Sequence, residues 1–329
     1  MNRKKIVVLG TGGTIAGTAP RASDNLGYTP AQRGVGELLA AIPDLAQFPL
    51  ELLSEQVAQI DSKDMDFSVW QRLLQRCAHW LERDDVQGLV LTHGTDTLEE
   101  TAYFLQAVLA PRKPVVLTCA MRPATSIGAD GPQNLMDALT VAACPGAQGV
   151  VAVCASTIHS AREVQKVHTW RLDAFSSGDA GALGHVVRGT LNMSRNWPQD
   201  PAALSADAIR KLVNLASWPR VEIVMSHAGA NGAMVDALVS PEVAQRFGAA
   251  PVRGLVASAT GNGSLHHELE AALLRAQAGG VRVVRATRCC NGQVLPVADQ
   301  MIPDSQGLSA AKARVALMLE LVAQQQVVG

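Results

Sequence analysis

The feature of this sequence that most limits its fold is a repeated alternation between short apolar runs and longer amphipathic segments. Each apolar run is rich in β-branched residues and ends in small or polar residues. Parallel strands are buried by the helices that connect them, so this alternation is typical of an α/β protein. The predicted strands of the first part of the chain are residues 5–9, 50–57, 88–92, 114–118 and 150–155. The predicted helices are 64–82, with Asp64 as N-cap, 98–109 and 133–143.

A second α/β unit follows a change of pattern. Residues 196–219 contain three prolines and no strand pattern, which indicates a linker. Beyond it lie predicted strands at 221–226, 254–259 and 281–286, and predicted helices near 233–239, 264–278 and 309–323. The sequence therefore predicts a larger N-terminal catalytic domain over 1–195, with a mainly parallel sheet flanked by helices. A linker over 196–219 and a smaller C-terminal α/β domain over 220–329 complete the expected organisation.

Composition excludes several classes of partner. The 28 basic and 29 acidic residues give a net charge of −1, so no broad positive field attracts nucleic acid or an anionic membrane. No apolar run approaches the ~18 residues of a membrane span, and the first, residues 6–9, is shorter than a signal-peptide core. The six cysteines lack CxxC spacing and stand in apolar context, which favours buried reduced thiols and a cytoplasmic location.

A glycine-rich turn, LGTGGTIAGT at 9–18, follows the first strand. It lacks the third glycine of a dinucleotide-binding turn, because Ile15 stands three residues after Gly12. It also lacks the lysine of a P-loop, because Thr18 follows Gly17. What remains is a turn that brings backbone close to a ligand and ends in Thr14, at the strand end where α/β sheets bind ligands. The alternative is a structural turn with an incidental threonine.

A second strand end has the same design. In GLVLTHGTDTLEETAYFL at 88–105, a glycine precedes Thr95 and Asp96, and a helix begins at Leu98. Asp96 or Thr97 could instead only cap that helix. Loops that follow neighbouring parallel strands converge on one crevice, so the two threonines are expected in one site. A threonine nucleophile requires a base and oxyanion donors, and the amides of the glycine turn are candidates for the donors.

These two motifs resemble those of the bacterial L-asparaginase family, the amidohydrolases of the asparaginase/glutaminase type. The resemblance rests on TGGTIAG at 11–17 and THGTDTLEETAYFL at 92–105. It continues through AMRP at 120–123, SIGADGPQNLMDA at 126–138, REVQKVHTW at 162–170, GNGSL at 261–265 and KARVALML at 312–319. It therefore covers essentially the whole chain and implies an asparaginase-like fold.

The resemblance implies hydrolysis of the side-chain amide of L-asparagine to L-aspartate and ammonia. Thr14 corresponds to the family's nucleophile, which is acylated before water releases the product. Thr95, Asp96 and Lys166 correspond to a second triad, in which a lysine and the second threonine handle a proton or activate water. Tyr28, in NLGYTP at 25–30, corresponds to a tyrosine on a mobile loop that hydrogen-bonds the first threonine.

Substrate-binding residues follow from the same resemblance. Ser62 corresponds to the serine that holds the substrate α-carboxylate, and Asp96 to the group that binds its α-ammonium. Asn262 corresponds to an asparagine supplied by the neighbouring subunit, and Asp299 aligns loosely with a neighbouring glutamate that is one methylene longer. The resemblance implies a homotetramer built from intimate dimers. The chemistry requires no metal and no cofactor, and the eight histidines show no metal-ligand spacing.

The chain departs from the family pattern around Ser62. Relatives commonly have glycine before this serine and glutamine after it, whereas Asp61 and Lys63 stand here. Asp61 is therefore a candidate substrate-binding residue, and the relative acceptance of asparagine and glutamine, including a minor glutaminase activity, stays open. Two other functions are compatible with the scaffold: an amino-acid sensor that binds without chemistry, and a transamidation subunit that delivers ammonia. The four residues Thr14, Thr95, Asp96 and Lys166 together favour the enzyme.

Overall fold

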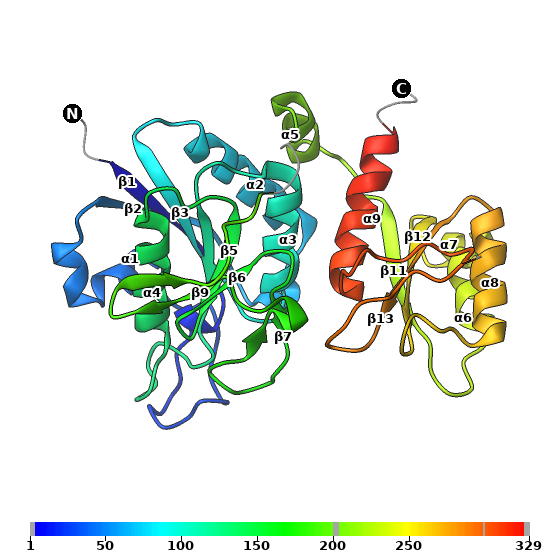
Figure 1. Cartoon of the computed structure of the whole chain (residues 1–329), viewed down its shortest axis with the longest axis horizontal. Helices are drawn as coiled ribbons and strands as arrows, with labels where there is room; N and C mark the ends of the chain where they lie inside the picture. Colours follow the sequence, from blue (N-terminus) through cyan, green and yellow to red (C-terminus); the bar gives the residue numbers. More distant parts are fainter. Residues whose placement is uncertain (1–3, 200–203, 299, 326–329) are drawn as a thin grey trace. The chain divides into compact units, whose positions relative to one another are not determined.

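The computed structural model describes residues 4–199, 204–298 and 300–325. The chain divides into two compact units, Met1–Asn214 and Leu215–Gly329, coloured blue to green and yellow-green to red in Figure 1. Each unit contains its own sheet and helices. The predicted fold class, a larger mainly parallel sheet unit followed by a smaller α/β unit, is confirmed.

The sheet of the first unit is built on five parallel strands. They are β1 (Lys5–Gly12), β2 (Glu51–Ile60), β3 (Val86–Thr92), β4 (Val115–Thr118) and β5 (Val150–Cys154). Three antiparallel strands extend the sheet: β6 (Thr157–Ser160), β9 (Gly184–Val187) and β10 (Thr190–Met193). The order is β10-β9-β6-β5-β4-β3-β1-β2. The antiparallel strands were not predicted, because each spans only four residues and β10 has no buried residue.

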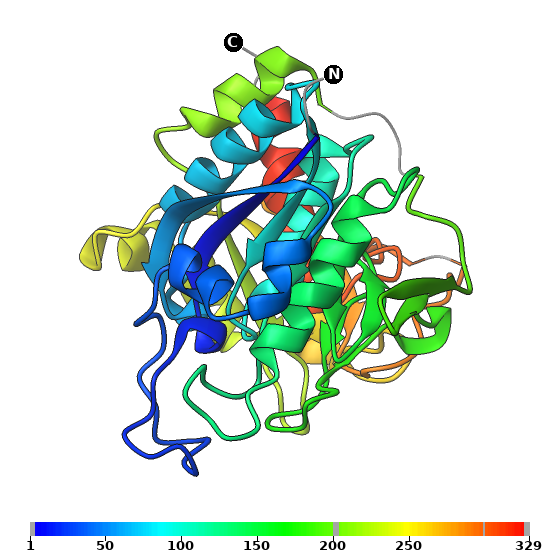
Figure 2. The same ribbon diagram turned by 90° about the vertical axis from the view of Figure 1, so that its left-hand side faces the viewer.

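Helices cover both faces of this sheet. Helices α1 (Val35–Ala40) and α4 (Gly131–Ala143) share one apolar core with alternate residues of the strands, among them Ile6, Val90 and Val151. The strand residues that alternate with these point to the opposite face of the sheet. There Figure 1 shows α2 (Phe67–Leu81) and α3 (Leu98–Leu109), and Figure 2 views the α1 and α4 side.

The start of α2 differs from the prediction. Asp66 is the N-cap, and its carboxylate accepts a hydrogen bond of 2.9 Å from the amide of Val69. Asp64 instead ends a short 3-10 helix, η3 (Ser62–Asp64), which precedes α2. Both aspartates are suitable caps, and the extra turn of η3 shifts the start of the α-helix by two residues.

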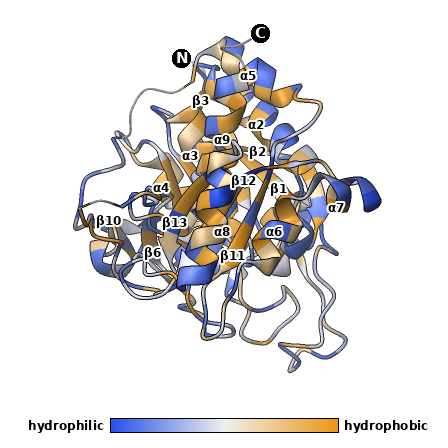
Figure 3. Ribbon diagram, turned by 90° about the vertical axis from the view of Figure 1, so that its right-hand side faces the viewer, coloured by the Kyte–Doolittle hydropathy of each residue, from blue (hydrophilic) through white to orange (hydrophobic). Residues whose placement is uncertain are grey.

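The second unit is a three-stranded parallel sheet with the order β11-β12-β13. The strands are β11 (Arg220–Met225), β12 (Val252–Ala259) and β13 (Arg282–Thr287). Its helices are α6 (Ala233–Val239), α7 (Pro241–Arg246), α8 (His267–Ala278) and α9 (Ala310–Gln325). The hydrophobic colouring of β12 in Figure 3 agrees with the burial of seven of its eight residues, as expected for a central strand.

The segment predicted as a linker contains a helix. Helix α5 (Ala206–Val213) packs against α2 and belongs to the first unit. The predicted boundaries at 195 and 220 remain a prediction.

All six cysteines are free thiols. Cys77, Cys119 and Cys154 are buried, as predicted, but Cys289 and Cys290 are exposed, so the expectation of burial is wrong for this pair. Burial raises the pKa of the Cys77 thiol to about 12. No helix of the described residues is both long enough and apolar enough to cross a bilayer.

Strand order determines where a ligand can approach. Strand β1 lies between β2 and β3 in the sheet, and β4 and β5 follow on the far side of β3. Because β1 and β3 are parallel neighbours, the loops that follow their carboxyl ends are adjacent. In an open parallel sheet, such a position is where ligands bind.

Candidate active site

The loops after β1 and β3 touch at two glycines. A Cβ atom on Gly13 would lie 2.4 Å from the Cα of Gly94, and a Cβ on Gly94 would lie 2.4 Å from the Oγ of Ser62. Gly13 also has a φ of +80°, which is unfavourable for residues with a side chain. Both glycines are therefore required for the two strand ends to approach this closely.

Thr14 follows Gly13 and begins the 3-10 helix η1 (Thr14–Ala16). Its side-chain oxygen lies 2.7 Å from the hydroxyl of Tyr28, and the residue is only 7% exposed. The Gly13 amide was a candidate oxyanion donor, but it donates a 2.9 Å hydrogen bond to the Ile60 carbonyl. That amide is consequently engaged in holding β1 and β2 together.

Thr95, Asp96 and Lys166 form a connected group. The Lys166 Nζ donates to the Thr95 Oγ1 at 2.8 Å and to the Asp96 carboxylate at 2.6 Å. Lys166 lies on the short strand β7 (Gln165–Lys166), which pairs with β8 (Phe175–Ser176). Its backbone amide donates to the Glu99 carboxylate at 3.0 Å, so helix α3 fixes the position of the lysine.

Ser62 connects a third loop to this group. Its Oγ accepts a hydrogen bond of 3.2 Å from the Asp96 amide, and its carbonyl accepts one of 2.8 Å from the Thr97 hydroxyl. Thr97 occupies the N-cap position of α3 without a side-chain cap bond, and the Asp96 carboxylate binds Lys166. The capping alternative therefore does not describe either side chain.

Asp61 and Lys63 flank Ser62 and pair with each other. Their charged groups lie 2.7 Å apart, and the Lys63 amine also lies 3.4 Å from the Asp64 carboxylate. The hydrogen bond to Asp61 raises the pKa of the Lys63 amine. The negative charge that Asp61 brings into the site is thus partly neutralised by Lys63, the other residue that departs from the family pattern.

A cavity of about 630 Å³ joins these groups. Its lining includes seven residues predicted from the sequence: Thr14, Tyr28, Asp61, Ser62, Thr95, Asp96 and Lys166. It also includes Asn25, Met121, Arg122 and Trp170, to which the sequence analysis assigned no role. Each stands in a segment that carries the family resemblance: Asn25 in NLGYTP, Met121 and Arg122 in AMRP, and Trp170 in REVQKVHTW. Those segments were the available signal.

The two residues predicted to complete a neighbouring site are in the second part of the chain. The Asn262 side chain accepts from the Leu295 amide at 2.7 Å and donates to the Leu295 carbonyl at 3.3 Å. Asp299 lies outside the described residues. Their contribution to a substrate site remains a prediction.

His93 is a buried residue of the site that the sequence analysis did not identify. Its ring Nδ1 lies 2.7 Å from the Gly94 carbonyl, which can only accept, so Nδ1 carries the proton. Burial lowers the pKa of His93 to about 4, so the ring is neutral at pH 7. His93 therefore stabilises the turn that precedes Thr95.

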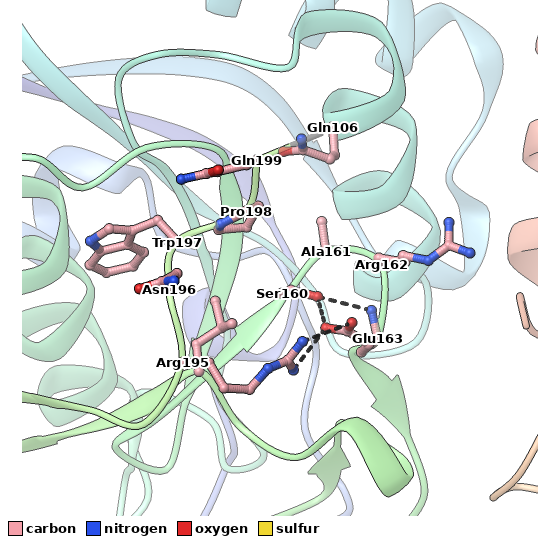
Figure 4. Close-up of a pocket in the computed structure, with 11 residues that line it drawn as sticks. Gln106, Ser160, Ala161, Arg162, Glu163, Arg195, Asn196, Trp197, Pro198 and Gln199 are labelled. Carbon is pink, nitrogen blue, oxygen red and sulfur yellow. Dashed lines mark hydrogen bonds and ion pairs between the residues drawn. The ribbon is translucent and has the colours of Figure 1, made fainter. Parts of the chain in front are cut away.

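A second, smaller cavity of about 210 Å³ lies beside the segment that leads to Lys166 (Figure 4). Arg195 pairs with the Glu163 carboxylate at 3.3 Å and donates to the Gly181 carbonyl at 2.9 Å. The Ser160 hydroxyl donates to the same carboxylate. Arg195 and Glu163 on this wall are thus paired, and their network holds Ser160 and Glu163 in place.

The first unit of this α/β fold has a cavity lined by two threonine hydroxyls, a lysine and an aspartate. These are features of an asparaginase-type hydrolase. Family models agree: "Asparaginase, N-terminal" matches residues 5–199, and "Glutaminase/Asparaginase C-terminal domain" matches residues 220–327. The chain belongs to the asparaginase family.

Known relatives match nearly the full length. L-asparaginase 2 of Bacillus subtilis is 36% identical over 324 residues, covering 96% of this chain and 82% of the relative. The glutaminase-asparaginase of Pseudomonas fluorescens is 34% identical over 331 residues, covering 97% and 87%. The solved structure of a probable cytoplasmic L-asparaginase from Campylobacter jejuni has 34% identity and a TM-score of 0.85, covering 97% of this chain and 95% of that one.

The contact between the two glycines can be tested with alanine. Gly13→Ala is expected to cost more than ~3 kcal/mol of unfolding free energy in urea, because the new Cβ meets backbone atoms. Gly146→Ala is the matched control: its φ is also +80°, but nothing lies within 4 Å of the added Cβ. That control is expected to cost only ~1–2 kcal/mol. Equal losses in the two variants would contradict the close approach.

Proposed function

We propose that the protein hydrolyses the side-chain amide of L-asparagine to L-aspartate and ammonia through an acyl-enzyme on Thr14. The observation that carries the proposal is that Thr14 and Thr95 line one cavity, each hydrogen-bonded to a group that can move a proton. Family membership and relatives named L-asparaginase support the same reaction.

In the proposed first step, the Thr14 oxygen attacks the amide carbon of the substrate. The Tyr28 hydroxyl, 2.7 Å from that oxygen, is within reach of the proton that the threonine loses. The carbon–nitrogen bond breaks, the nitrogen is protonated and ammonia leaves. The product of this step is an aspartyl ester of Thr14.

In the proposed second step, water attacks the ester carbon. In this proposed step Lys166 acts as the neutral amine: the water gives a proton to the Thr95 oxygen while the Thr95 proton passes to the lysine nitrogen, 2.8 Å away. The Thr14 oxygen takes up a proton from this pair when the ester bond breaks. The ester bond breaks, L-aspartate leaves and the Thr14 hydroxyl is restored. Neither step uses a metal or a cofactor.

The proposed substrate contacts place opposite charges at the two ends of the amino acid. The buried Ser62 hydroxyl is proposed to hold the α-carboxylate, with Asp61 beside that end of the substrate, and Asp96 is proposed to bind the α-ammonium. We propose a homotetramer of intimate dimers in which Asn262 and Asp299 of a neighbouring subunit complete the site. A minor glutaminase activity is also proposed, since several relatives are named glutaminase-asparaginase.

A cytoplasmic location belongs to the same proposal. It is supported by the similarity to a probable cytoplasmic enzyme of Campylobacter jejuni, while a relative from Haemophilus influenzae, 34% identical, is named periplasmic. The cysteines favour a cytoplasmic over a periplasmic location, because all six thiols are free.

Removing either threonine hydroxyl tests the proposed chemistry. Thr14→Ala and Thr95→Ala are each expected to lower kcat for ammonia release from L-asparagine by ~10³-fold or more, because each removes a reacting oxygen. Thr140→Ala is the control, since the Thr140 hydroxyl binds the Met136 carbonyl within α4. Near-normal turnover by Thr14→Ala would exclude it as the nucleophile. Asparagine binding by calorimetry without any product from the wild type would instead indicate the amino-acid sensor.

The ion pair beside Ser62 is expected to tune substrate affinity. Lys63→Gln should raise KM for L-asparagine about fivefold, because the Asp61 charge then stands unpaired near the substrate carboxylate. The double variant Asp61→Gly/Lys63→Gln removes both charges and should return KM to within about twofold of the wild type. Steady-state kinetics of the three proteins decides the point. A double variant that keeps the KM of Lys63→Gln would refute this explanation.

A further inference from the structure

Two loops extend side by side from the carboxyl ends of β1 and β4. They are the blue loop at residues 17–30 and the blue-green loop at residues 121–130, both at the bottom of Figures 1 and 2. The first carries Tyr28 and the second carries Met121 and Arg122, and all three residues line the cavity. Four hydrogen bonds join them: Ala124 N to Gly17 O at 2.9 Å, Ala19 N to Thr125 Oγ1 at 2.8 Å, Ile127 N to Ala22 O at 2.9 Å, and Ser126 Oγ to Asn25 Oδ1 at 2.5 Å.

The bond between Ser126 and Asn25 is the one made by two side chains. Ser126 is 9% exposed, and Asn25 is itself part of the cavity wall. Between Asn25 and Tyr28 the loop forms a tight turn, in which the Asp24 carboxylate accepts from the amides of Leu26 at 3.0 Å and Gly27 at 2.7 Å. These bonds lower the pKa of Asp24. Because this turn links Asn25 to Tyr28, we expect a displacement of Asn25 to move Tyr28 as well.

The second loop is anchored in the body of the first unit. The Asp130 carboxylate accepts from the amides of Met121 at 2.9 Å and Arg122 at 3.0 Å, and from the Asn134 side chain at 3.2 Å. Asn134 is a buried residue of helix α4. The base of the loop that carries Ser126 is thus fixed to helix α4, so this loop can support the more exposed first loop.

Apolar packing contributes little to this contact. Leu26 and Ile127, near the tips of the two loops, are each 84% exposed. Since burial of apolar area is small, polar contacts determine whether the loops stay together.

From these contacts we infer that Ser126 and Asn25 are positioning residues, which hold the Tyr28 hydroxyl on the Thr14 oxygen by fixing the first loop to the second. The inference rests on the proposed function in that Thr14 is the nucleophile. Neither residue needs to touch the reacting atoms. Ser126 in particular is not among the residues that line the cavity.

The kinetic test is a double-mutant cycle with Tyr28. Ser126→Ala is expected to lower kcat for L-asparagine about tenfold with less than a twofold change in KM, because the misplaced group touches the nucleophile. Ser126→Thr keeps the hydroxyl and should restore most of the rate. In a Tyr28→Phe background, Ser126→Ala should cause no further loss, because Ser126 acts through Tyr28. An equal tenfold loss in that background would overturn the inference.

A second readout is independent of activity. Arg21 lies in the first loop, so the initial rate of trypsin cleavage after Arg21, followed by mass spectrometry, reports how often that loop leaves its support. Cleavage is expected to be at least about fivefold faster in Ser126→Ala and unchanged in Ser68→Ala, whose hydroxyl binds Asp66 on α2. If the wild type releases no ammonia from L-asparagine but Ser126→Ala is still cleaved faster than the wild type, the contact is retained and the proposed function is rejected. Unchanged cleavage in Ser126→Ala would reject the contact.

Discussion

The site depends on one steric constraint, the backbone contact between Gly13 and Gly94. Strands β1 and β3 are neighbours in the sheet, but neighbouring strands alone leave room for side chains between the loops that follow them. With both side chains absent, the loops approach so closely that a single added carbon would lie 2.4 Å from backbone. Thr14 and Thr95 each follow one of these glycines directly, so the contact brings both hydroxyls to one cavity.

The backbone that carries the groups around the threonines is fixed by secondary structure. Lys166 reaches Thr95 from a two-residue strand whose amide is held by the first turn of α3. The preceding segment is held by the paired Arg195 and Glu163 beside the second cavity. Such support matters because small displacements of a reacting group are costly to a rate. The exception is the loop of Tyr28: its base is closed by hydrogen bonds between Thr18 and Thr29, and its outer part depends on hydrogen bonds to the loop after β4.

Sequence reasoning succeeded where one local signal determined the outcome. Helices α3 and α6 begin and end where their apolar periodicity predicts, and the glycine–threonine pairs identified both strand ends. It failed where two signals competed or none existed. Asp64 and Asp66 are equally good caps, and only the turn of η3 decides between them. The antiparallel strands are too short for a clear period, and the burial of His93 follows from tertiary packing that no spacing reveals.

The central claim is that the Thr14 oxygen forms a covalent bond with the substrate inside the shared cavity. Acid quenching during turnover of isotope-labelled L-asparagine, followed by mass spectrometry of the tryptic peptides, measures this directly. The account predicts a labelled aspartyl group on the peptide 6–21, with fragmentation assigning it to Thr14. A labelled group on the peptide 84–112, which contains Thr95, or no labelled peptide despite turnover, would contradict it.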